Sequence, residues 1–244
     1  MNRENVLFIV VGVLLGYIVA FHLVVYWNQG EAATAGGAPA GAGVPADHPE
    51  VPTNDVKERQ RLQTAAEEAG RVARADSRNF DAQAAAARAF LAARDFEGAI
   101  DFLTRANQLR PEDHETLVQL GHANNGARRF EDAERWYKAA LARRPDDPDV
   151  RTELAATYYF REPPQPDKAM AVLRETLQRD PGHVATLHNL AFLLIEARRF
   201  DEADETLKRL ERADPSYPQL PGLRQELEKA RASAPADQKK SPAD

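Results

Sequence analysis

The chain has 244 residues, of which 43% are hydrophobic and 29% charged, a balance that allows a packed core and one or two ordinary domains. Its 32 basic and 38 acidic residues are interspersed and give a net charge of -6, which excludes the basic stripe typical of nucleic-acid-binding proteins. The absence of cysteine excludes disulfides, thiolate zinc sites and covalent haem attachment.

The most hydrophobic stretch lies near the N-terminus, from Val6 to Tyr26, and contains no charged residue. As a helix it would be about 31 Å long, which matches a hydrocarbon core of about 30 Å. A cleaved signal peptide is the alternative, but this run is longer than the roughly 7–15 apolar residues of a secretory core. We therefore expect residues 1–27 to form a single-pass anchor in the lipid bilayer.

Basic residues flank this anchor unevenly, because Arg3 precedes it and the next basic residue is Lys57. The positive-inside rule then predicts an inner (cytoplasmic) membrane protein with a cytosolic N-terminus and an extracytoplasmic, periplasmic remainder. Gly12, Gly16 and Ala20 recur every four residues, a spacing that lets two membrane helices pack closely. Small residues are also common in unpaired membrane helices, so homodimerisation through this strip is a hypothesis.

Two segments lack any periodic pattern of hydrophobic residues. Residues 28–53 are rich in glycine, alanine and proline, which predicts a flexible linker. Residues 233–244 combine prolines and lysines with almost no large apolar side chain, which predicts a disordered tail.

The region between these segments is a repeat. Prolines at positions 111, 145, 181 and 215 are spaced by 34, 36 and 34 residues. A second motif, an aromatic residue followed three positions later by alanine, begins at Phe96, Phe130 and Phe200, with Pro166 in the same place in the third block. A period of this length predicts a solenoid of two-helix units.

The second block resembles the tetratricopeptide repeat, because the family's signature spacing is matched by Leu117, Leu120, Gly121, Ala133, Tyr137, Ala140 and Pro145. Asn124 departs from the usual aromatic residue, and the third block has two extra residues between Arg161 and Pro166. The resemblance covers about residues 55–232 and implies an all-α superhelical solenoid. Its expected parts are an N-terminal capping helix at 54–77, four repeats over 78–216 (78–112, 113–146, 147–182 and 183–216) and a C-terminal capping helix at 217–232.

In this family the first helix of each pair lines a concave groove that binds a segment of another protein. The resemblance implies that the groove positions are Arg88, Leu91, Val118, His122, Asn125, Thr152, Tyr159, His188, Phe192 and Ile195. Members that bind a terminal carboxylate present lysine, asparagine and arginine here, whereas this chain has Val118, Thr152 and Ala156. Tyr159 and Phe192 are candidate anchors for a partner, with burial in the core as the alternative, and Tyr158 is expected in the core.

No other motif points to chemistry. The histidine pairs have no carboxylate at ligand spacing, which argues against a metal site at His114 and His122 or at His183 and His188. There is no phosphate-binding loop and no nucleophile motif. The paired arginines at positions 128–129 and 198–199 fall in the turns inside the helix pairs, where solvated charge is the first interpretation and a partner-facing basic edge the second.

The sequence therefore predicts a membrane-anchored scaffold that binds other proteins, membrane-associated or extracytoplasmic, and that is not an enzyme, needs no cofactor and binds no nucleic acid. An assembly factor for an envelope complex, such as one for cytochrome c maturation, is an alternative that rests on similar architecture alone. A subunit with an unrecognised catalytic role is a further alternative, which no motif supports.

Overall fold

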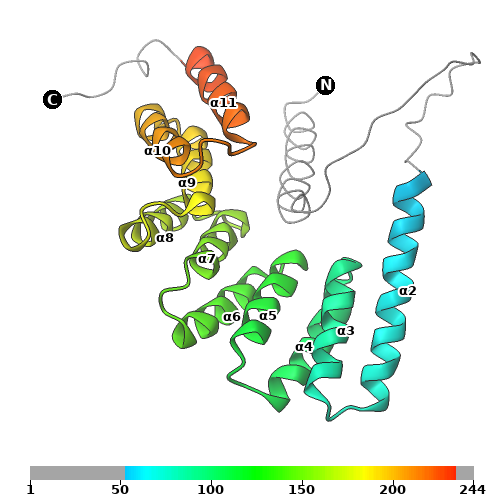
Figure 1. Cartoon of the computed structure of the whole chain (residues 1–244). Coiled ribbons are helices and arrows are strands. Elements are labelled where there is room, and N and C mark those ends of the chain that lie inside the picture. The colour runs from blue at the N-terminus through cyan, green and yellow to red at the C-terminus, as the bar shows by residue number, and fades with distance from the viewer. Residues whose placement is uncertain (1–52, 235–244) are drawn as a thin grey trace, which may run out of the picture. The chain divides into compact units, whose positions relative to one another are not determined.

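The computed structural model describes residues 53–234, and every regular element in this range is an α-helix (Figure 1). The prediction of an all-α solenoid is confirmed for this range. In chain order the helices are α2 (Thr53–Ala75), α3 (Phe80–Ala92), α4 (Phe96–Leu109), α5 (His114–Gly126), α6 (Phe130–Arg143), α7 (Pro148–Phe160), α8 (Pro166–Arg179), α9 (Val184–Glu196), α10 (Phe200–Ala213) and α11 (Leu220–Ser233).

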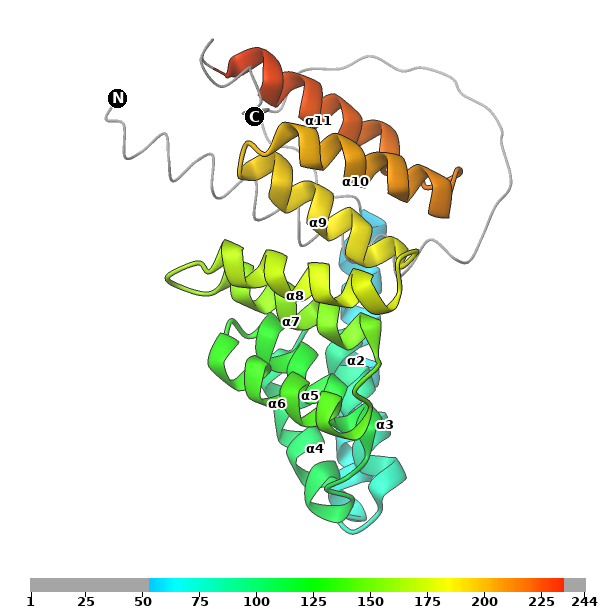
Figure 2. The same cartoon turned by 90° about the vertical axis from the view of Figure 1, so that its left-hand side faces the viewer.

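Eight of these helices form four hairpins, in which α3 pairs with α4, α5 with α6, α7 with α8 and α9 with α10. Each first helix has 13 residues and each second helix has 14. The second helix of each hairpin also contacts the first helix of the next, so the hairpins stack in chain order (Figure 2). The helix α2 packs on α3 at one end, and α11 packs on α9 and α10 at the other.

The turns inside three hairpins are closed by an arginine in the left-handed conformation, with φ of 59° at Arg94, 60° at Arg128 and 57° at Arg198. After Arg128, the N–H of Arg129 donates to the carbonyl of Asn124 at 2.8 Å, and the N–H of Arg128 donates to Asn125 at 3.0 Å. These two bonds form a Schellman motif, which satisfies carbonyls that the helix end leaves free. The turn arginines thus have a backbone role that their charge does not indicate.

The third hairpin turns differently, because two extra residues precede Pro166. The turn is extended at Arg161, contains a cis peptide bond between Glu162 and Pro163, and closes with a bond from the N–H of Gln165 to the carbonyl of Tyr158 at 2.9 Å. The side chain of Arg161 folds back onto the second hairpin, where its guanidinium contacts Glu131 and Glu134. The insertion therefore adds a polar contact between two hairpins.

The connections between hairpins follow the proline spacing. Each second helix ends two residues before its proline, as α4 does at Leu109 before Pro111. The next first helix begins at an N-cap side chain that accepts a backbone N–H, as Asp113 does from Thr116 at 2.9 Å. Comparable caps are supplied by Asn79, Asp147 and His183.

Asp180 and Asp214, which precede the last two prolines, are the C-cap residues of α8 and α10 and do not cap the helices that follow. Asp180 accepts from the N–H of Gly182 at 3.2 Å, and Asp214 accepts from Ser216 at 2.9 Å, so both stabilise the turn itself. The helix caps lie further along the chain, at His183 for α9 and Gln219 for α11.

Aromatic side chains fill the space that small residues leave between paired helices. A methyl group added to Gly121 would lie 2.4 Å from the ring of Tyr137, which is fully buried. Gly98 has the same relation to Phe90, at 2.2 Å. Glycine is therefore required at these positions by close approach rather than by backbone conformation.

A polar network joins the second hairpin to the third. The carboxylate of Glu134 accepts from the hydroxyl of Tyr158 at 2.9 Å, from Arg161 at 2.9 Å and from Lys138 at 2.7 Å. Partial burial raises the pKa of this carboxyl, but the bonds from Lys138 and Tyr158 outweigh burial and hold the pKa at about 2. Glu134 is therefore an ionised side chain that connects two repeats through hydrogen bonds.

Several predicted segments lie outside the described range. No helix between Thr53 and Ser233 is long and apolar enough to cross a bilayer. The predicted anchor at Val6–Tyr26, its strip at Gly12, Gly16 and Ala20, and residues 28–52 of the predicted linker are not described. At the other end, α11 continues to Ser233 and Ala234 is buried, so these two residues belong to the folded part rather than to the tail.

Candidate partner-binding surface

The first helices of successive hairpins lie against each other. Contacts join α5 to α7, α7 to α9 and α9 to α11, while the second helices lie on the other side of the hairpins (Figure 1). We call the side formed by α3, α5, α7, α9 and α11 the first-helix face. It is the surface to which the sequence assigns the partner-binding residues.

The ten predicted groove residues fall into three groups by exposure. Two are exposed: Arg88 and His122. Five are partly buried, which leaves an accessible edge on each: Leu91, Val118, Asn125, Tyr159 and Phe192. Three are buried and offer no surface to a partner: Thr152, His188 and Ile195.

The three buried members pack hairpins together instead. The hydroxyl of Thr152 lies 2.6 Å from that of Thr186 in the next hairpin. The ring of His188 meets Tyr217 edge-on at 5.6 Å, with Nδ1 3.2 Å from the tyrosine hydroxyl. Ile195 belongs to the main hydrophobic cluster. Residues later in the chain, Thr186 and Tyr217, cover Thr152 and His188, and the spacing within one repeat does not reveal this.

Three aromatic rings meet on this face at the junction of the third and fourth hairpins. Tyr159 packs edge-on against Phe192, with ring centroids 5.9 Å apart, and against Phe160 at 5.1 Å. All three side chains are partly buried, whereas Tyr158 is 2% exposed and lies in the core as predicted. Sequence reasoning missed Phe160, although its place beside Tyr159 in the last turn of α7 is a usable signal.

Two exposed carboxylates belong to the same part of the solenoid, Glu196 at the end of α9 and Glu226 in α11, and the charge of Glu196 acts on both Tyr159 and Glu226. Burial and then the charge of Glu196 raise the pKa of the Tyr159 phenol. Partial burial and then the charge of Glu196 raise the pKa of Glu226, and the positive charge of Lys229 lowers it. The sequence pattern did not identify either carboxylate, because they come from different helices.

The second hairpin presents a more polar part of the face. His122 is exposed and meets Tyr137 edge-on, with centroids 5.7 Å apart. Burial, with a smaller effect of Glu153, raises the pKa of Tyr137 well above its ordinary value. Val118 and Tyr159 both pack against the same hydrophobic cluster, so the core continues to the surface along this face.

His114 and His183 lie near carboxylates of neighbouring repeats rather than near another histidine. His114 lies 3.4 Å from Asp147, and His183 lies 3.2 Å from Asp149. Within residues 53–234, no three side chains of metal-ligating type come together. These histidines therefore join repeats at the ends of the first helices.

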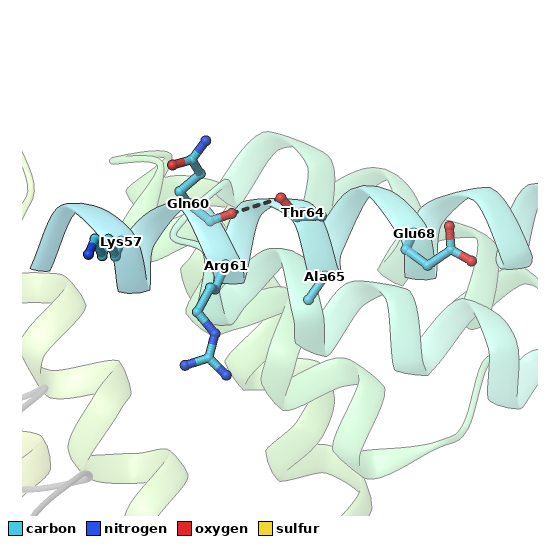
Figure 3. Close-up of a pocket in the computed structure, with 6 residues that line it drawn as sticks. All are labelled: Lys57, Gln60, Arg61, Thr64, Ala65 and Glu68. Carbon is cyan, nitrogen blue, oxygen red and sulfur yellow. Dashed lines mark hydrogen bonds between the residues drawn. The ribbon is translucent and has the colours of Figure 1, made fainter. Parts of the chain in front are cut away.

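Two hollows lie away from the first-helix aromatic rings. One, of about 670 Å³, is lined by α2 residues including Lys57, Arg61 and Glu68 (Figure 3). Its lining residues in the described chain all come from one helix, and the contact drawn is the bond from Thr64 to the carbonyl of Gln60. The other, of about 430 Å³, lies among α8, α9 and α10, where Arg174 binds Glu202 at 3.0 Å. Neither brings unpaired groups together for chemistry.

Comparison with known proteins gives the family. Profiles described as tetratricopeptide repeat match residues 114–157 and residues 165–237. The chain carries tetratricopeptide repeats. The second, third and fourth hairpins lie in or overlap the matched residues.

One curated protein resembles this tetratricopeptide-repeat chain in sequence. It is the Hsp70/Hsp90 co-chaperone cns1 of Schizosaccharomyces pombe, which is 29% identical over 126 residues. The match covers 48% of this chain and 34% of the relative, so the chain spans about a third of the length of the curated protein it matches.

Solved structures share the solenoid at low sequence identity. YrrB, described as a TPR protein with an unusual peptide-binding site, has a TM-score of 0.54 and 16% identity over 70% of this chain and 88% of its own. MamA from Desulfovibrio magneticus RS-1 has a TM-score of 0.56 and 16% identity over 68% and 92%. PilF from Pseudomonas aeruginosa has a TM-score of 0.54 and 16% identity over 73% and 85%. At these identities the likeness concerns the fold alone.

Proposed function

We propose that this tetratricopeptide-repeat protein is a membrane-anchored scaffold that binds segments of partner proteins on its first-helix face. The observation that carries the proposal is the set of partly buried apolar side chains on successive first helices, Val118, Tyr159 and Phe192, which extend the core to the surface. Aromatic side chains of this kind dominate the energetics of protein interfaces. A groove built on rigid helices also loses little conformational entropy when it binds.

The test is cross-linked capture of partners by the full chain from detergent-extracted membranes. We expect the double substitution Tyr159→Ala and Phe192→Ala to remove most of the captured protein, because truncating interface anchors commonly costs about 2 kcal/mol each. The matched control is Val72→Ala with Leu109→Ala, which truncates two exposed apolar side chains on α2 and α4. Capture that survives the aromatic substitutions would refute the proposal.

The membrane part of the proposal rests on the uncharged run Val6–Tyr26 and on Arg3 before it. Because the chain has no cysteine, single cysteines can report its topology. We expect Ser77→Cys, an exposed position after α2, to react with an impermeant maleimide in intact cells, and Asn2→Cys to react only after lysis. Equal labelling of both positions before lysis would contradict a cytosolic N-terminus.

Homodimerisation through Gly12, Gly16 and Ala20 is a separate part of the proposal. An isoleucine side chain in this strip would keep two helices apart. We expect Gly16→Ile to abolish cross-linking between two copies of the full chain in membranes, and Leu14→Ile, which falls on the opposite face of the predicted helix, to have no effect. Unchanged self-association of Gly16→Ile would remove the hypothesis.

Similarity to the yeast protein cns1 raises a chaperone as a candidate partner. The similarity covers a third of that protein, and the positions that bind a terminal carboxylate elsewhere in the family carry Val118, Thr152 and Ala156 here. Thr152 is buried, so it is not available to any ligand. We therefore favour an internal segment of a partner over a chain terminus, and a peptide with a free carboxylate should bind no better than its amide.

A further inference from the structure

The aromatic rings and carboxylates at the last two repeats form a single surface, which we call the acidic aromatic end. It consists of Tyr159 and Phe160 from α7, Phe192 and Glu196 from α9, and Glu226 from α11. The rings touch each other, and Glu196 acts electrostatically on both Tyr159 and Glu226. The helix α11 packs on α9 after the last hairpin, and the charge of Glu196 acts on Glu226 across this helix contact.

The charges at this end are only partly compensated within the described chain. Neither Glu196 nor Glu226 forms an ion pair with any residue of 53–234, although most hairpins are linked by such pairs. The arginines of α11 bind elsewhere, Arg224 to Glu211 at 2.7 Å and Arg231 to Asp201 at 3.4 Å. Lys229, one turn from Glu226, is the basic side chain that offsets part of this charge.

We propose that the acidic aromatic end binds a partner segment through an arginine side chain, which lies over the Tyr159 and Phe192 rings and between the Glu196 and Glu226 carboxylates. The inference rests on the proposed partner-binding function and specifies the chemistry of its ligand. A guanidinium fits both components, since it stacks on aromatic faces and also donates parallel hydrogen bonds to carboxylates. It would offset the repulsion by which the charge of Glu196 raises the pKa of Glu226.

Other ligand chemistries fit this surface less well. An acidic segment or a terminal carboxylate would be repelled by both glutamates. A purely apolar segment would cover the rings but would also desolvate two unpaired charges, which is costly. A lysine would gain the charge attraction but lacks the planar group that stacks on a ring while binding a carboxylate.

The experiment measures binding of short fluorescent peptides to the full chain in phosphatidylcholine nanodiscs, which carry no net charge. The peptides share one capped, leucine-containing sequence and differ at one site, which is arginine, glutamine or glutamate. The test variant is Glu196→Gln with Glu226→Gln. The control is Glu67→Gln with Asp101→Asn, exposed carboxylates on α2 and α4 that have no ion pair in the described chain and give the same change in net charge. Circular dichroism checks that each variant keeps its helices.

We expect the arginine peptide to bind at least about tenfold more tightly than the other two, and the test variant to lose about tenfold in affinity for it. The control variant should stay within about twofold, and added salt should remove the preference. Equal binding of the arginine and glutamine peptides, unchanged binding by the test variant, or no binding of any peptide would overturn the inference. In each of these cases, partner capture that still depends on Tyr159 and Phe192 would leave the proposed function standing, and capture independent of them would end both.

Discussion

The two ends of the solenoid are built from the same repeat but bury different side chains. The N-terminal cluster, in α2 to α5, consists of five alanines with Phe102, Leu103 and Leu120. The C-terminal cluster, from α5 to α11, contains Tyr137, Tyr158 and many leucines. Alanine allows close helix packing but removes little apolar surface from water, and hydrophobic stabilisation scales with that surface at about 25 cal/mol per Å². The comparison indicates that one repeat pattern can give a weaker end and a stronger end.

The candidate binding residues follow this difference. Tyr159 and Phe192 lie on the strong end, where leucine and tyrosine packing holds the first helices in place. A site on rigid elements keeps its side chains close to the geometry that binds, so less conformational freedom is lost on association. The position of the acidic aromatic end is therefore consistent with a docking role. The weaker N-terminal end extends the solenoid.

The largest expected effect comes from truncating equivalent core leucines. Leu103 lies four residues after Ala99 in α4, and Leu173 lies four residues after the equivalent Ala169 in α8. The two leucines are 0% and 1% exposed. Each substitution to alanine should remove about 3 kcal/mol of local stability. In a stack with nearest-neighbour coupling, Leu103→Ala should let α2 to α4 unfold separately, whereas Leu173→Ala should destabilise the centre.

Urea denaturation followed by far-ultraviolet circular dichroism, with hydrogen exchange resolved by peptide, distinguishes these outcomes. Leu103→Ala should give an early transition and fast exchange confined to residues 53–109. A single cooperative transition with the same midpoint shift in both variants would contradict the difference between the two ends.

A smaller effect is expected at the junction of the second and third hairpins. Glu134→Gln weakens the bonds from Arg161, Lys138 and Tyr158 and should cost about 2 kcal/mol, because hydrogen bonds to a partly buried charge exceed neutral ones. The matched control is Glu97→Gln, which breaks an exposed pair with Arg129 in the weaker half and should cost under about 1 kcal/mol. Equal losses in chemical denaturation would remove the distinction.

The same carboxyl predicts a pH dependence. The pKa of Glu134 is about 2 in the folded protein, below its ordinary value of 4.5. Its ionised form therefore stabilises the fold above about pH 4.5, and this contribution is lost as the pH falls from there towards about 2. The stability difference between wild type and Glu134→Gln should shrink over that window, as followed by thermal melts at a series of pH values.

The smallest expected effect concerns the hydroxyl pair between the third and fourth hairpins. Thr152→Val removes the bond to Thr186 and should cost about 1 kcal/mol. The corresponding positions one junction earlier are Val118 and Val150, so the register accepts valine. The double substitution of both threonines also removes the contact of Thr186 with His183, but it should cost less than the sum of the single substitutions, because the bond between the two hydroxyls is lost only once. A double variant that loses the sum of both single effects would show that the hydroxyls act independently.

Much of the fold could be predicted because the same sequence pattern recurs in four blocks. The prolines at 111, 145, 181 and 215 predicted where second helices end, and Leu120 and Tyr137 matched the signature spacing of the repeat. Both lie fully buried. These features depend on contacts within one hairpin, where sequence spacing and distance in space are closely linked.

The candidate site was harder to predict, because it depends on contacts between hairpins. Val118 keeps an accessible edge, whereas Thr152 and His188, at the same position of their first helices, are covered by Thr186 and Tyr217 from later in the chain. No spacing within one repeat reports how far the next repeat overlaps it.

The sequence by itself determined the helical hairpin, its period and the side chains that each pair buries, since these follow from local periodicity and helix-ending residues. Only the tertiary structure decided that Phe160 and Phe192 both pack against Tyr159, and that the charge of Glu196 acts on Glu226 in another helix. The physical reason is that side chains far apart in the chain become neighbours through the stacking of whole hairpins, and the angle of that stacking arises from the summed packing of many residues.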